Sequence, residues 1–133
     1  MAIPIGRHTA RMDGDILYLK LMGDLSLAEM DAYIELANQV KEQHSRFFII
    51  DDMAHFGSAS PEVRKKVASW FSSCGCVGVA LHGASLASRT MALLVIGAMK
   101  LFGSYTLPIG FFQTEALAHD WVIAQRQKLA QSK

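Results

Sequence analysis

The apolar positions of this chain predict an ordered series of strands and helices. Two strand-like runs, residues 6–12 and 16–22, are separated by Asp-Gly-Asp at residues 13–15, and an Asp-Gly pair between such runs is typical of a β-hairpin. Three later runs have the composition of strands: residues 47–50, 76–81 and 106–112. In the last of these, Pro108 has no backbone donor and therefore favours the edge of a sheet.

Apolar residues at helical spacing predict four helices. Ser26 and Glu29 form a capping box at the start of the first helix. Ser60 followed by Pro61 is a favoured start for the second, and Thr114 caps the last. The predicted helices cover residues 26–43, 60–71, 85–102 and the segment from 114 onward.

The resulting order is β-β-α-β-α-β-α-β-α, which predicts an α/β fold. A hairpin followed by alternating strands and helices implies a mixed, mostly parallel five-stranded sheet with four helices. The first strand is expected at one edge of this sheet. The length of 133 residues fits a single domain, residues 1–133, because domains of this size bury a core of their own.

Composition narrows the classes of function. The net charge of +1 gives no electrostatic basis for nucleic-acid binding. Two cysteines, Cys74 and Cys76, are too few for a disulfide framework, as expected of a protein in a reducing cytoplasm. The start of the chain lacks the pattern of a signal peptide. The apolar segment 91–99 is about half as long as a membrane span, so we expect a cytoplasmic protein without an integral membrane segment.

Asp51 and Asp52 are the first candidates for chemistry, because they follow the buried strand 47–50 directly. Paired carboxylates can hold Mg²⁺ or accept a phosphoryl group, yet no downstream lysine that ends a strand and no Asp-x-Asp spacing accompany them. We therefore expect them to end the strand and solvate a loop. The five histidines show no ligand spacing, and no nucleophile elbow or phosphate-binding loop occurs. The sequence predicts a protein that is not an enzyme and has no metal or cofactor.

Two serines stand between this strand and the second helix. Ser60 is interpreted as a helix cap, and Ser58 lies just before it. A phosphate on Ser58 would face free amides and the positive end of the helix dipole. The segment from Asp51 to Ser60 is therefore predicted to be a regulatory or interaction loop.

The segment 91–102 is apolar on every side of a helix, with Met91, Leu94, Val95 and Met99 among its residues. Burial in the core is the simplest interpretation. A homodimer face and a binding site for an apolar small molecule are the alternatives, because an uncovered apolar surface of this size is otherwise a liability.

The element order and the serine before the second helix resemble the STAS domains, the anti-sigma-factor antagonist family. Arg64, Trp70 and the closing segment 110–121 are similar to small bacterial STAS-like proteins. In antagonist STAS domains, a kinase phosphorylates a serine in this loop and thereby switches partner binding; by position it would be Ser58. The Asp-Ser-Ser-Gly pattern of the antagonists is absent, since Gly57 precedes Ser58 and Ala59 follows it.

The resemblance implies a non-enzymatic regulatory or protein-interaction module, a bacterial signalling component whose partner is another protein. The CRAL-TRIO lipid-transfer domains have a related sheet that holds a hydrophobic ligand. The alternative is therefore an apolar ligand or lipid bound beside the helix 91–102.

Overall fold

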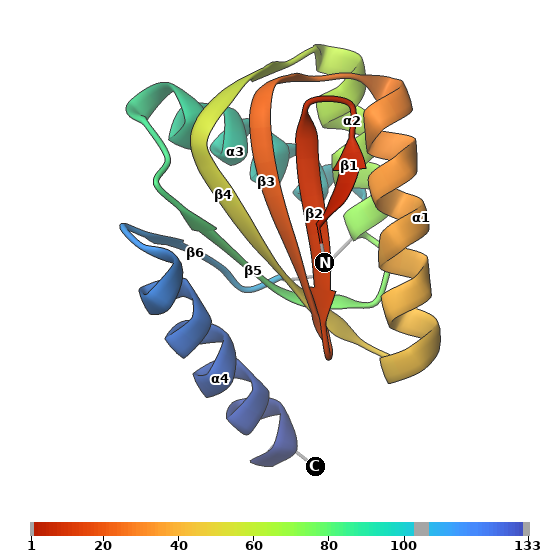
Figure 1. Ribbon diagram of the computed structural model, residues 1–133, viewed down its shortest axis with the longest axis vertical. Coiled ribbons are helices and arrows are strands. Elements are labelled where there is room, and N and C mark those ends of the chain that lie inside the picture. Colours follow the sequence, from red (N-terminus) through yellow and green to blue (C-terminus); the bar gives the residue numbers. More distant parts are fainter. Residues whose placement is uncertain (1, 103–106, 132–133) are drawn as a thin grey trace.

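The computed structural model describes residues 2–102 and 107–131 (Figure 1). These residues form, in chain order, β1 (Ile3–Ile5), β2 (His8–Asp13), β3 (Ile16–Leu25), α1 (Leu27–His44), β4 (Phe47–Ala59), α2 (Pro61–Phe71), β5 (Cys76–His82), α3 (Leu86–Met99), a 3-10 turn (Lys100–Phe102), β6 (Ile109–Phe112) and α4 (Glu115–Gln131). The predicted α/β class and the four helices are confirmed.

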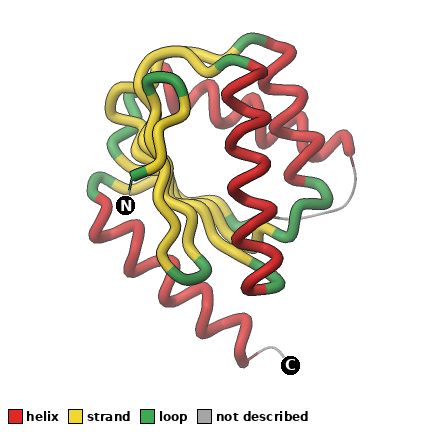
Figure 2. The backbone as a smooth tube through the Cα atoms, turned by 45° about the vertical axis from the view of Figure 1, so that its right-hand side comes forward, coloured by secondary structure: helices red, strands yellow, loops and turns green. Residues whose placement is uncertain are grey.

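The strands lie in the sheet in the same order as in the chain, from β1 to β6. The first three are antiparallel neighbours, and β3 to β6 are parallel neighbours. Helices α1, α2 and α3 lie on one side of the sheet and α4 lies on the other (Figure 2). Helices α1, α2 and α3 each connect two neighbouring parallel strands. Connections of the same hand that advance in the same direction across a sheet place their helices on the same face, which explains why these three lie together.

The described residues form six strands, one more than predicted. The additional strand, β1, pairs with β2 around a turn at Gly6, whose φ is +60°. A three-residue run that contains Pro4 is too short to be recognised from periodicity, and the missing donor of Pro4 is tolerated because β1 is at the edge. The first predicted strand is therefore interior. The last strand, β6, is at the opposite edge, as was predicted from Pro108. Residue 106, where this strand was predicted to begin, lies outside the described part of the chain, as do residues 103–105.

The third and fourth strands are longer than the apolar runs that predicted them. β3 was expected to end near Met22 and β4 near Ile50, but they continue side by side to Leu25 and Ala59. Two register shifts, between Lys20 and Met22 and between Gly23 and Leu25, interrupt this second half. Backbone pairing between strands does not require apolar side chains, and the shifts increase the local bend. The expectation that the two aspartates end β4 is wrong.

Two apolar clusters fill the space on the two faces of the sheet. The larger one lies under α1, α2 and α3, and includes Phe47 and Ile49 of β4. The smaller one lies under α4, and includes Phe48 and Ile50. Alternate residues of β4 thus supply both clusters, as expected for a strand covered on both faces. Ala118 and Val122 bury the inner face of α4, whereas Leu117 and Ala124 are exposed.

Side-chain hydrogen bonds hold two helices against the strands. The Arg126 guanidinium of α4 donates to both carboxylate oxygens of Asp15 in the β2–β3 turn, at 2.5 and 3.1 Å. On α1, Glu29 accepts from the Ser26 amide at 2.9 Å and lies 3.1 Å from Nε2 of the buried His8. The Nδ1 atom of His8 accepts from the Met22 amide, so the proton of a neutral ring is on Nε2 and is donated to Glu29. The predicted capping box is confirmed and extends into the sheet.

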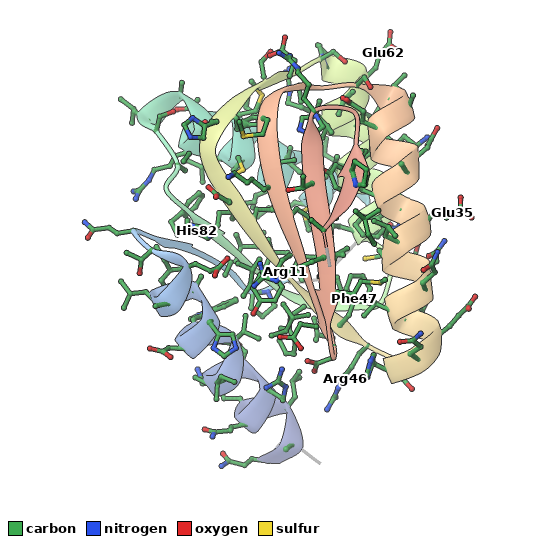
Figure 3. The ribbon with its side chains drawn as sticks, in the orientation of Figure 1. Arg11, Glu35, Arg46, Phe47, Glu62 and His82 are labelled. Carbon is green, nitrogen blue, oxygen red and sulfur yellow. The ribbon has the colours of Figure 1, made fainter. Side chains whose placement is uncertain are left out.

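Glu29→Ala is expected to lower the free energy of unfolding by about 1–2 kcal/mol, because it removes the cap and leaves the buried His8 donor without its acceptor. Glu35 on the outer face of the same helix is a matched control (Figure 3). Urea unfolding monitored by circular dichroism measures both variants. A loss for Glu35→Ala as large as that for Glu29→Ala would show that the contact with His8 contributes nothing.

No helix within the described residues is long and apolar enough to cross a membrane.

Candidate functional site

Asp51 and Asp52 point to opposite faces of the sheet. Asp51 lies in a row with Leu19 and Leu81 on the neighbouring strands, and Asp52 lies in the next row with Lys20 and His82. Because neighbouring residues of a strand face opposite sides, the two carboxyl groups do not form a paired site for Mg²⁺ or a phosphoryl group. Each belongs to a separate cavity.

Asp51 faces an apolar cavity between the sheet and the helices α1, α2 and α3. The volume of this cavity is about 140 Å³. The residue as a whole is half-buried, but its Oδ1 atom is shielded from solvent and has no hydrogen-bond partner in the described structure. Burial, and secondarily the charge of Asp52, raises the pKa of Asp51 to about 7. Such a carboxyl is partly protonated at neutral pH, unlike one on the surface.

The hydroxyl group of Tyr33 also lines this cavity and has no hydrogen-bond partner in the described part of the chain. Tyr33 is on α1 and is only 3% exposed. Its burial, followed by the charges of Asp51 and Glu29, raises its pKa well above the usual range. The phenol therefore stays protonated and retains its donor. Sequence analysis missed this group, because Tyr33 falls in the apolar stripe of its helix.

The apolar helix contributes only one side to the cavity. Met91, Val95 and Met99, three of the four residues predicted to bind a ligand or form a dimer face, line it. The fourth, Leu94, is 54% exposed and lies on the outer surface of α3. The interpretation that the core buries this apolar segment is wrong for its outer side, because α3 packs on α2 and the sheet and leaves that side exposed.

Asp52 lies on the α4 face, in a polar cavity of about 270 Å³. Its Oδ1 atom accepts from the Ala54 amide at 3.1 Å. Charged groups from three other elements line the same cavity: Arg11, Lys20 and Glu115. The Arg11 guanidinium lies 3.8 Å from the centre of the Tyr18 ring and 3.9 Å from the carboxylate of Glu115, the first residue of α4 (Figure 3). The two basic residues of the lining balance its two acidic residues, Asp52 and Glu115, so the cavity has no strongly unbalanced charge.

Ser58 is exposed and lies near the end of β4, not in a loop. The Oδ1 atom of Asp24 accepts from the Ser58 amide at 2.9 Å and from its hydroxyl at 3.1 Å. A Cβ atom on Gly57 would lie 2.3 Å from this oxygen and about 3 Å from the backbone of β3. Only glycine therefore permits this approach. We call Asp24, Gly57 and Ser58 the β3–β4 tip.

The second helix begins directly beyond the β3–β4 tip. The Ser60 side chain accepts from the Val63 amide at 3.2 Å, and Pro61 is in the first turn, so the predicted cap is confirmed. Arg64 donates to the Ala59 carbonyl at 2.6 Å. Asp24 is the residue of this region that sequence analysis missed, because Gly23-Asp24 has the pattern of a strand end. The interaction role of Asp51, Asp52, Ser58 and Ser60 stays a prediction.

Among the residues that the structure describes, the cysteines and histidines do not form a further metal or redox site. Both cysteines are buried, and the Cys76 amide donates to the sulfur of Cys74 at 3.4 Å. The hydrogen bond between the two side chains lowers the pKa of Cys74, whereas burial raises that of Cys76. His82 lies at the end of β5 beside β6 (Figure 3). Within the described residues, no three groups of His, Cys, Asp or Glu are placed to hold a metal ion.

Comparison with known proteins identifies the fold. No family model matches the chain, and no curated protein matches it. Among solved structures, the chain is similar to the anti-sigma factor antagonist SpoIIAA in its unphosphorylated form. The TM-score is 0.63 at 15% identity, over 88% of this chain and 96% of that one. The chain therefore has the STAS-like fold that its element order predicts.

Proposed function

We propose that this protein is a non-enzymatic regulatory module that binds another protein through the β3–β4 tip and the first turn of α2. We further propose that phosphorylation of Ser58 weakens this contact. The fold supports the first statement, because the similar structure is that of an anti-sigma factor antagonist. The second statement rests on one observation, the two hydrogen bonds from Ser58 to Asp24.

These hydrogen bonds give Ser58 a defined environment. The hydroxyl is exposed on the surface, yet it is held by a carboxylate from the neighbouring strand. A phosphate carries a charge of about −1.5 to −2 at pH 7, and on Ser58 it would replace a donor to Asp24 with a second anion. Repulsion would then separate the Ser58 side chain from Asp24 and change the shape of the β3–β4 tip.

Two guanidinium groups lie near this tip. Arg7 packs against Gly23, the neighbour of Asp24, and Arg64 donates to the carbonyl of Ala59, the neighbour of Ser58. Arginine forms strong charge-assisted hydrogen bonds with phosphate. We expect a phosphorylated Ser58 to leave Asp24 and turn toward one of these groups. The modification would thus exchange one set of contacts for another without unfolding the strand.

Ser58→Asp is expected to weaken partner binding at least about tenfold, because it places a second carboxylate against Asp24, whereas Ser58→Ala changes the Kd less than about threefold. The partner is first isolated with the tagged wild-type protein and then purified for calorimetric titration. Ser73→Asp adds the same charge at the far end of α2 and is the matched control. Equal affinities for Ser58→Asp and Ser73→Asp would exclude the switch.

A further inference from the structure

The apolar cavity holds a buried carboxyl group that the proposed function does not use. We propose that this cavity binds a small apolar amine, about the size of one aromatic ring, whose ammonium group pairs with Asp51 beside the Tyr33 hydroxyl. This site goes beyond the proposed function, because it lies on the helix-covered face of the sheet and not at the β3–β4 tip.

The shape and lining of the cavity select an apolar body. Its walls come from the sheet and from all three helices on this face, with Leu21, Ile49 and Leu81 on one side and Met30, Trp70 and Val95 on the other. Its volume of about 140 Å³ is close to that of an engineered apolar cavity, about 150 Å³, that holds benzene. A single ring fits this volume, whereas a long acyl chain is too large.

The two polar groups in the cavity determine the kind of head group. Oδ1 of Asp51 and the hydroxyl of Tyr33 are shielded from solvent and have no hydrogen-bond partner among the described residues. Buried polar atoms in proteins are nearly always hydrogen-bonded, so each one without a partner requires an explanation. A ligand that donates hydrogen bonds would satisfy the Asp51 carboxylate, and the phenol oxygen of Tyr33 can also accept a hydrogen bond from it.

The charges around Asp51 favour a cationic donor over a neutral one. The Asp52 charge acts against ionisation of Asp51. The only described cation that lines the cavity is Arg64, and its hydrogen bonds go to the Ala59 carbonyl and the Met91 sulfur. The described residues thus provide no ion-pair partner for Asp51. An ammonium group supplies both the donor and the missing charge, and a desolvated charge pair is stable only when it is complete.

Benzylamine and toluene are the probes that separate the two parts of this inference, because they share the ring and differ in the ammonium group. Calorimetric titration at pH 8, above the pKa of Asp51, keeps the carboxylate ionised. We expect saturable binding of benzylamine, with an affinity at least about tenfold higher than that of toluene. Equal affinities, or no saturable binding of benzylamine, would overturn the proposal.

Two variants test the assigned residues. Asp51→Asn keeps the shape and is expected to weaken benzylamine binding at least about tenfold while leaving toluene binding unchanged. Asp52→Asn removes a carboxylate on the opposite face of the sheet, and we expect it to change benzylamine binding less than about threefold. Amide chemical shifts in two-dimensional NMR spectra verify that both variants are folded. A loss that is as large for Asp52→Asn as for Asp51→Asn would contradict the assignment of the ammonium to Asp51.

Discussion

Asp51→Asn is expected to raise the free energy of unfolding at pH 8 by about 2 kcal/mol or more. The ordinary pKa of an aspartate is 3.8, and in the folded protein burial raises that of Asp51 to about 7. At about 1.4 kcal/mol per pKa unit this difference corresponds to about 4 kcal/mol. The asparagine amide has a desolvation cost of its own, which reduces the gain.

The sign of the pH dependence follows from the raised pKa. Between pH 3.8 and about 7, the folded protein retains a proton on Asp51 that the unfolded chain has already released. Stability contributed by this group is therefore full below pH 3.8, falls as the pH rises toward 7, and is constant above it. Asp51→Asn removes this fall, so the difference between variant and wild type should grow across that interval.

Urea unfolding at several pH values between 4 and 8 measures this difference. Asp52→Asn is the matched control. It removes only the smaller contribution to the raised pKa of Asp51, so the free energy of unfolding should rise less than half as much as in Asp51→Asn. If the difference in free energy of unfolding between Asp51→Asn and the wild type were the same at pH 8 as at pH 4, the Asp51 carboxyl would be well solvated. An Asp51 that reduces stability is consistent with a binding role, because functional groups are often placed at the expense of stability.

Gly57→Ala is expected to lower the free energy of unfolding by about 2–3 kcal/mol and to abolish partner binding through the β3–β4 tip. The added methyl group would lie 2.3 Å from Oδ1 of Asp24 and within about 3.1 Å of the backbone of β3. The carboxylate must therefore move, and both hydrogen bonds to Ser58 are lost. The two strands must also separate slightly, since backbone atoms cannot rotate away as a side chain can.

Gly97→Ala is a control of opposite sign. Gly97 lies inside α3, and a Cβ atom there would have no neighbour within 4 Å. Alanine is the better helix former, so this variant should be more stable by about 0.5–1 kcal/mol. Thermal unfolding measures both variants. A Gly57→Ala protein that is as stable as the wild type would mean that the close approach of the strands at this tip is not required.

The sequence predicts the parts of the fold that depend on the periodicity of side chains. The starts of α1 and α2 were predicted from the capping serines Ser26 and Ser60. The buried strand β4 was predicted from its unbroken apolar run. The ends of β3 and β4 were not predictable in this way, because they are held by backbone pairing in which exposed and polar residues take part. The extra strand β1 was missed because its three residues are too few to show a period.

The candidate site depends on contacts between distant parts of the chain, and these have no local signal. Asp24 and Ser58 are 34 residues apart, and only the parallel pairing of β3 with β4 brings them together. The adjacency of Asp51 and Asp52 suggested a pair, whereas the alternation of a strand places them on opposite faces. Tyr33 had the spacing of a core residue, and its unpartnered hydroxyl is apparent only from the structure.

The central claim, that the β3–β4 tip and the first turn of α2 contact a protein partner, is tested most directly by site-specific photocrosslinking in cells. A photoreactive amino acid replaces Glu62, which is exposed in the first turn of α2 (Figure 3), or Gln127, which is exposed on α4. We predict a discrete crosslinked protein from position 62 that is absent from position 127 and is lost when Ser58→Asp is added. The same crosslinked protein from both positions, or from position 127 alone, would contradict the account.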